Sequence, residues 1–262
     1  MQEGFLTERG IAYRTNTFVP GRKTLLFVHG LSGSLSAWYP YETIFEEKYN
    51  LITFDLRGHG LSVRPSRRGY AMAEIVEDIY ALLKHLRVEH CSIVGHSFGT
   101  LIAMEFVRAH PGVAERVVLL SPPYGPHYFR LSHLITNLAA WLAFMPLRLH
   151  RYRRTDYAQF YPTGDWSLDR IGADIAHMGL RSYLYSLRVV FARDYTPDWG
   201  VLRCPVLIMH GGKDSLASVI HGQALAAILP AATLTILPGA NHILVLNNIP
   251  EVAAEIEKFV QQ

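Results

Sequence analysis

The five residues from Gly95 to Gly99, with the sequence Gly-His-Ser-Phe-Gly, constrain the fold of this chain more than any other segment. They follow a short apolar run at 91–94 (CSIV), which is typical of a buried strand, and they lead into a helical pattern at 101–110. A serine flanked by glycines between a strand and a helix predicts a sharp turn that exposes the Ser97 hydroxyl above a sheet. The glycines let neighbouring backbone approach, and the amides at the helix N-terminus favour developing negative charge.

Apolar runs and helical periodicity alternate along most of the chain. The remaining strands are expected at 12–19, 24–28, 51–54, 116–120, 205–209 and 233–237. Helices other than 101–110 are expected at 72–86, 220–229 and 252–260. Such alternation indicates an α/β fold with a mostly parallel sheet that is covered by helices on both faces.

The alternation stops between residues 124 and 203. No clear strand is expected there, because aromatic residues, arginines and helix-like spacing dominate this segment. We therefore expect a core domain formed by residues 1–123 and 204–262, with a helical insertion at 124–203.

The insertion holds two features that bear on a substrate. An apolar stretch at 131–147 contains Trp141 and Phe144, which are candidate substrate-binding residues in the roof of a pocket, although a buried helix face would have the same composition. From Pro122 to Thr155 there are five arginines and no acidic residue. A solvated surface explains this excess most simply. The alternatives are attraction of an anionic substrate or a peripheral contact with anionic lipid.

A serine hydroxyl needs a base, and that base needs an acid to orient it. His242 follows the expected strand 233–237, and Asp214 follows the expected strand 205–209. Both residues should lie at the carboxyl edge of the sheet, on the same side as Ser97. The order Ser97, Asp214, His242 is that of serine hydrolases with a nucleophile at a strand–helix turn. We therefore expect these three residues to be catalytic.

Two other strand ends compete for the position of the acid. The end of the strand 116–120 offers Ser-Pro-Pro at 121–123 and no carboxylate. Asp55 does follow a strand, but it precedes Ser97 in the chain, and we interpret it as a structural residue of the turn Asp-Leu-Arg-Gly-His-Gly.

An oxyanion hole requires two main-chain N–H donors. One is expected from Phe98, directly after the serine, and the other from Leu31 in the loop after the strand 24–28, with Ser32 as the second choice. His29 in the same loop is interpreted as a packing and hydrogen-bonding residue.

The set HGLSG, DLRGHG, GHSFG, HGGKD and GANH resembles the α/β-hydrolase superfamily, in the branch of capped serine esterases, lipases and C–C bond hydrolases. The resemblance implies an eight-stranded, mostly parallel sheet with an inserted helical cap, a Ser-His-Asp triad, no cofactor and no metal. The acid loop reads Asp-Ser-Leu-Ala and lacks the proline that is frequent in relatives. The insertion matches no particular subgroup.

These observations favour a serine carboxylesterase that acts on small to medium acyl esters. A C–C bond hydrolase of aromatic breakdown, a lipase or monoacylglycerol lipase, a thioesterase and a lactonase remain alternatives that would use the same residues. A non-catalytic ligand receptor is a further alternative from another class. Ser97 argues against epoxide hydrolases and haloalkane dehalogenases, which use an aspartate nucleophile on this fold.

Composition bears on binding partners, metal sites and cellular location. A net charge of +3 is small for a nucleic-acid-binding protein, and the 13 histidines lack zinc-site spacing. Only two cysteines, Cys91 and Cys204, suit a reducing compartment, and the N-terminus does not resemble a signal peptide, so a cytoplasmic location is expected. The longest apolar stretch is too short to span a bilayer. A monomer or homodimer is expected.

Overall fold

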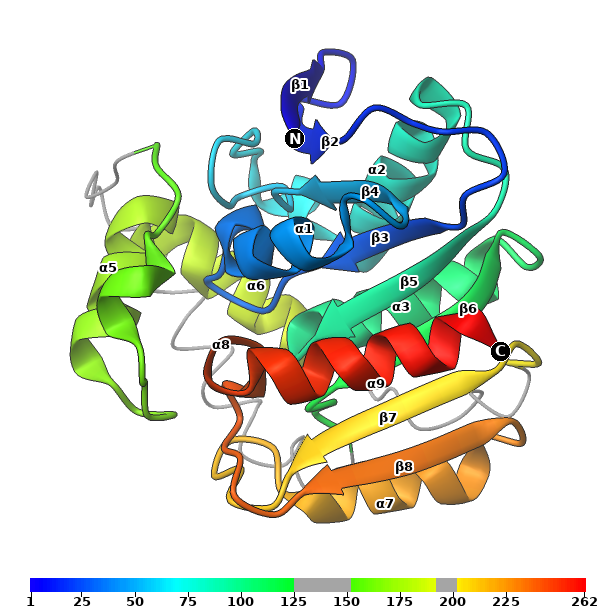
Figure 1. Cartoon of the computed structure of the whole chain (residues 1–262). Coiled ribbons are helices and arrows are strands. Elements are labelled where there is room, and N and C mark those ends of the chain that lie inside the picture. The colour runs from blue at the N-terminus through cyan, green and yellow to red at the C-terminus, as the bar shows by residue number, and fades with distance from the viewer. Residues whose placement is uncertain (125–151, 192–201) are drawn as a thin grey trace.

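The computed structural model describes residues 1–124, 152–191 and 202–262 (Figure 1). Its centre is an eight-stranded sheet in the order β1-β2-β4-β3-β5-β6-β7-β8. The strands are β1 (Gln2–Leu6), β2 (Ile11–Thr15), β3 (Thr24–Val28), β4 (Asn50–Phe54), β5 (Cys91–His96), β6 (Ala114–Leu120), β7 (Val206–Gly211) and β8 (Ala232–Leu237). Neighbouring strands from β4 to β8 in this order pair in parallel, whereas β2 pairs antiparallel with both β1 and β4. The predicted α/β fold with a mostly parallel sheet is confirmed.

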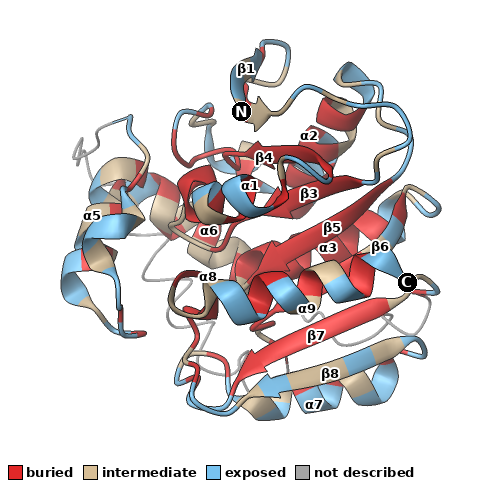
Figure 2. Ribbon diagram, viewed as in Figure 1, coloured by how far each residue is buried: buried red, intermediate tan, exposed pale blue. Residues whose placement is uncertain are grey.

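Helices cover both faces of this sheet. One face carries α2 (Met72–His85), α3 (Phe98–Ala109) and α7 (Val219–Ile228), and the other carries α1 (Tyr39–Phe45) and α9 (Ile249–Gln261) (Figure 1). The central strands are buried on both sides, as Figure 2 shows, and every residue of β3 and β5 is buried. Strands buried on both faces need continuous apolar runs, which is why TLLFV and CSIV were recognisable in the sequence.

Several elements of the core were not expected from the sequence. Strand β1 lies at the edge of the sheet and is mostly exposed, so it has no apolar run to mark it. Helix α1 is short and begins at a tyrosine followed by proline. The 3-10 turns Leu35–Trp38 and Arg67–Tyr70 and the short helix α8 (Leu244–Asn247) were not expected either.

The described part of the expected insertion is helical. It contains the 3-10 turn η4 (Tyr157–Phe160) and the helices α5 (Leu168–Met178) and α6 (Leu180–Phe191), which stand beside the sheet (Figure 1). Residues 125–151, with Trp141 and Phe144, lie outside the described residues. In the described part of the chain, no helix is long and apolar enough to cross a membrane.

Polar contacts fasten this helical segment to the core. Arg154 forms ion pairs with Asp55 and Glu3, both at 2.8 Å. The Tyr70 hydroxyl donates to the Ser182 hydroxyl at 2.8 Å. Arg154 is one of the five arginines between Pro122 and Thr155, for which a solvated surface was the simplest interpretation. Its side chain is only 10% exposed, and its charge is paired.

Candidate active site

Ser97 occupies the turn between β5 and α3. Its backbone has φ 51° and ψ −116°, a strained conformation that projects the side chain from the turn. The flanking glycines are required by close backbone approach, because a Cβ on Gly99 would clash with the carbonyl oxygen of Val28. A Cβ on Gly95 would lie 2.5 Å from the carbonyl oxygen of Gly99. The pentapeptide therefore forms the sharp turn that its sequence predicts.

The structure brings together the three residues expected to be catalytic. The Ser97 hydroxyl donates to Nε2 of His242 at 2.9 Å, and Nδ1 of His242 donates to Oδ2 of Asp214 at 2.8 Å. Ser97 lies after β5, Asp214 after β7 and His242 after β8, so parallel strands deliver all three to one edge of the sheet. This geometry suits a neutral imidazole that keeps its proton on Nδ1 and can accept the serine proton on Nε2.

Asp214 is held as a carboxylate by its surroundings. Burial acts to raise its pKa, but hydrogen bonds from His210 and His242 outweigh that effect, and the pKa lies well below its ordinary value. Oδ1 also accepts from the main-chain amides of Leu216 at 3.0 Å and Ala217 at 2.7 Å. Asp214 can therefore stabilise an imidazolium without taking up its proton.

The two residues expected to supply the amides of the oxyanion hole, Leu31 and Phe98, line the same cavity as Ser97. Phe98 is the first residue of α3, where a helix has no internal acceptor for its amide. The loop that contains Leu31 passes close to the serine, since a Cβ on Gly30 would lie 3.3 Å from Cβ of Ser97. His29 instead accepts from the amide of Leu56 through Nε2 at 3.0 Å, which fits its expected structural role.

A cavity of about 340 Å³ opens over Ser97. Its lining is mainly apolar, and helix α6 supplies part of it; representative apolar residues are Leu31, Trp38, Leu187, Val245 and Leu246. Polar groups enter from the segment before and within α5, including Tyr157, Arg170 and Asp174. Within the described residues, no three His, Cys, Asp or Glu side chains are grouped so as to hold a metal ion.

The polar cluster in the cavity wall was not found by sequence reasoning. Asp174 accepts from the hydroxyls of Thr155 at 2.8 Å and Tyr157 at 3.0 Å, and it pairs with Arg170 at 3.3 Å. Burial raises the pKa of Asp174 to about 6. Asp165 and His96 were also missed, and both contact the main chain of His242. No motif marks the two aspartates, which lie in the segment 124–203, where no strands were expected.

Three buried histidines should make the protein sensitive to acid. Burial lowers the pKa values of His29, His59 and His96, for His96 to about 3. Below about pH 6.5 the unfolded chain takes up protons on these residues that the folded chain refuses. The free energy of unfolding should therefore be highest above about pH 6.5 and fall as the pH drops towards 3, by up to about 1.4 kcal/mol per pH unit for each histidine.

Urea denaturation at several pH values checks this expectation. His59→Asn is the informative variant, since its amide nitrogen can replace Nδ1 as the donor to the carbonyl oxygen of Arg57. Its free energy of unfolding should fall less steeply with acid than that of the unmodified chain. Equal slopes for the two proteins would show that His59 does not contribute.

The sequence and the fold of this chain are both similar to those of known proteins. A family model described as alpha/beta hydrolase fold matches residues 23–249. A protein of Escherichia coli K12 named putative carbamate hydrolase RutD is 26% identical over 236 residues, which cover 83% of this chain and 84% of the relative. The enol-lactonase from Burkholderia xenovorans LB400 superposes with a TM-score of 0.76 at 21% identity, over 96% of both chains. A thermophilic esterase from Thermogutta terrifontis also gives 0.76, at 19% identity, over 96% of this chain and 93% of its own.

Proposed function

The chain belongs to the α/β-hydrolase family, and from that premise we propose that it is a serine carboxylesterase for small and medium acyl esters. The observation that carries the proposal is the hydrogen-bond sequence from Ser97 through His242 to Asp214, with distances of 2.9 and 2.8 Å, at the floor of a largely apolar cavity. An apolar cavity favours an acyl group, and the three side chains are those that ester hydrolysis needs.

In the proposed reaction, Ser97 attacks the ester carbonyl carbon while Nε2 of His242 takes the hydroxyl proton. The negative charge that forms on the carbonyl oxygen is stabilised by the amides of Leu31 and Phe98. Collapse of the intermediate breaks the bond to the alcohol, which leaves with the proton from His242. A water molecule, deprotonated by His242, then attacks the acyl-enzyme and releases the carboxylic acid with Ser97 restored.

The size of the cavity supports the choice of short to medium acyl groups. A volume of about 340 Å³ is at the lower end of the range for small-molecule sites. We expect turnover of p-nitrophenyl esters to peak between acetate and octanoate and to fall sharply at palmitate. A peak at palmitate would instead assign a lipase, and no turnover by folded protein would remove the esterase proposal.

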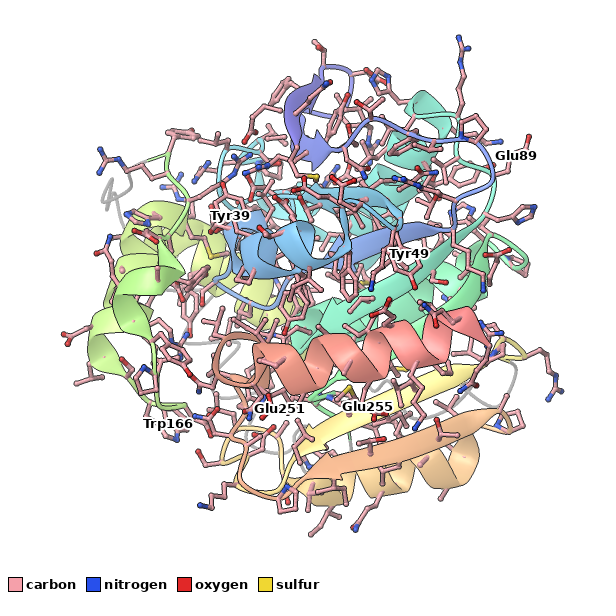
Figure 3. The ribbon with its side chains drawn as sticks, in the orientation of Figure 1. Tyr39, Tyr49, Glu89, Trp166, Glu251 and Glu255 are labelled. Carbon is pink, nitrogen blue, oxygen red and sulfur yellow. The ribbon has the colours of Figure 1, made fainter. Side chains whose placement is uncertain are left out.

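Asp214→Asn should lower kcat by about 10³- to 10⁴-fold, because the amide cannot hold the Nδ1–H tautomer or stabilise the imidazolium. The comparison is with Glu89→Gln, which removes a carboxylate from an exposed position; Figure 3 shows it on the opposite side of the view from Trp166, a residue that lines the cavity. That control should retain full activity. Near-full activity in Asp214→Asn would mean that another group is the acid.

Hydrolysis of carbamates is the second candidate function. It is favoured by the curated relative named putative carbamate hydrolase, which covers 83% of this chain. A carbamate carbonyl can be attacked by the same serine, but its nitrogen makes the carbonyl carbon less reactive. Comparing p-nitrophenyl acetate with p-nitrophenyl carbamate separates the two candidates: a higher kcat/KM for the carbamate would favour the second.

A further inference from the structure

Asp165 joins the segment before α5 to the two loops that carry His242 and Asp214. We propose that Asp165 is a positioning residue, which fixes the main chain of both loops so that the imidazole of His242 meets Ser97 and Asp214. The inference rests on the proposed function, because it assigns a role within the same site. Trp166, labelled in Figure 3, is the next residue along, and its indole N–H donates to the hydroxyl of Ser215 at 3.1 Å.

Both oxygens of the Asp165 carboxylate are engaged by these loops. Oδ1 accepts from the main-chain amide of His242 at 2.8 Å. Oδ2 accepts from the amide of Ser215 at 2.8 Å and from its hydroxyl at 2.7 Å, and Ser215 directly follows Asp214. One carboxylate therefore bridges the main chain of the base to the residue next to the acid.

Asp165 is itself rigidly held. It is only 7% exposed, and its carbonyl oxygen accepts from Nη2 of Arg170 at 3.1 Å. Two residues earlier, the carbonyl oxygen of Thr163 accepts from the side-chain amides of Asn241 at 2.9 Å and Asn247 at 2.7 Å. The turn at 163–165 is thus hydrogen-bonded to residues before and after His242, so its position relative to the His242 loop is fixed.

The chemistry of the contacts requires a carboxylate. Three donors converge on Asp165, and a carboxylate can accept from all of them, whereas an amide would present its NH₂ group to one side. Removing the carboxylate would leave the buried amide of His242 without an acceptor and would free the amide of Ser215, so these loops would shift. A shift of about 1 Å in a catalytic group can lower a rate by about 10²-fold.

Asp165 also borders the cavity, so a direct contact with substrate is the competing explanation. The two roles differ in what they change. A positioning residue alters the rate of the chemical steps and the reactivity of Ser97 towards any electrophile. A residue that binds substrate alters KM and leaves that intrinsic reactivity in place.

The test compares Asp165→Ala and Asp165→Asn with Asp169→Asn, a matched control in which an exposed aspartate of α5 loses its charge. For each folded variant, kcat and KM are measured with p-nitrophenyl acetate, together with the rate at which a p-nitrophenyl phosphonate ester modifies Ser97. We expect Asp165→Ala to lower kcat and the phosphonylation rate by about 30- to 100-fold, with KM changed less than about threefold. Asp165→Asn should fall between Asp165→Ala and the unmodified chain, and Asp169→Asn should match the unmodified chain.

Unchanged kcat and phosphonylation in folded Asp165→Ala would overturn the inference, and so would a raised KM alone. If Asp165→Ala does not fold, the same criteria apply to Asp165→Asn. An unmodified chain that neither hydrolyses esters nor reacts with the phosphonate would instead overturn the proposed function, and the inference with it. The two failures can therefore be told apart. If only the inference is wrong, the unmodified chain is active and the Asp165 variants are equally active.

Discussion

Ser97→Ala is expected to lower kcat/KM for ester substrates by about 10⁴- to 10⁶-fold, because the variant has no nucleophile to form an acyl-enzyme. The residual rate should come from the cavity and from the amides of Leu31 and Phe98, which the substitution leaves in place. Only one oxygen atom is removed, and the Cβ that the turn already accommodates remains. The variant should therefore fold normally, and steady-state kinetics on purified protein measure the loss.

Ser66→Ala is the matched control for this prediction, since Ser66 is exposed and lies at the start of the 3-10 turn Arg67–Tyr70. It should retain the activity of the unmodified chain. If Ser97→Ala keeps more than about a tenth of the activity, a serine nucleophile at this position is ruled out.

Gly99→Ala is expected to lower the free energy of unfolding by about 3 kcal/mol, which is a large part of the roughly 5–15 kcal/mol that is ordinary for a folded domain. A Cβ at this position would clash with the carbonyl oxygen of Val28, and it would lie 2.8 Å from that of His29. Both obstacles are main-chain atoms at the end of a central strand, so neither can rotate away. The gain of about 1 kcal/mol in helix propensity on replacing glycine does not offset this clash.

The contrasting substitution is Gly172→Ala, within α5. A Cβ there meets nothing within 4 Å, and the residue is exposed, so the free energy of unfolding should rise by about 0.5–1 kcal/mol. Urea denaturation of the two variants gives the comparison directly. A Gly99→Ala protein as stable as the unmodified chain would mean that the turn is looser than its backbone contacts indicate.

The sheet and its carboxyl edge could be anticipated from the sequence because buried parallel strands have a distinctive composition. TLLFV, CSIV and VLIM are buried and each ends at a glycine-containing loop, and the loops after parallel strands meet at one edge. The proximity of Ser97, Asp214 and His242 followed from strand ends alone, although Ser97 and His242 are far apart in the chain. Edge strand β1 could not be found in this way, because most of its residues are exposed and it carries no apolar run.

The wall of the cavity could not be anticipated, for a physical reason. Asp165 acts through contacts with the amides of His242 and Ser215, which exist only once its segment has docked on the core. No local spacing records such contacts, and the surrounding residues have ordinary surface composition. A buried aspartate that accepts from two loops far away in the chain looks the same, in sequence, as a solvated one.

The central claim is that Ser97 is the nucleophile, and covalent trapping tests it most directly. The folded protein is incubated with a p-nitrophenyl phosphonate ester, then digested, and the peptides are examined by mass spectrometry while ester turnover is followed in parallel. We expect one phosphonyl group per chain, on Ser97, with turnover lost in proportion to labelling, and no such adduct in His242→Ala over the same period. Labelling at another residue, or full turnover by protein that is phosphonylated at Ser97, would contradict the claim.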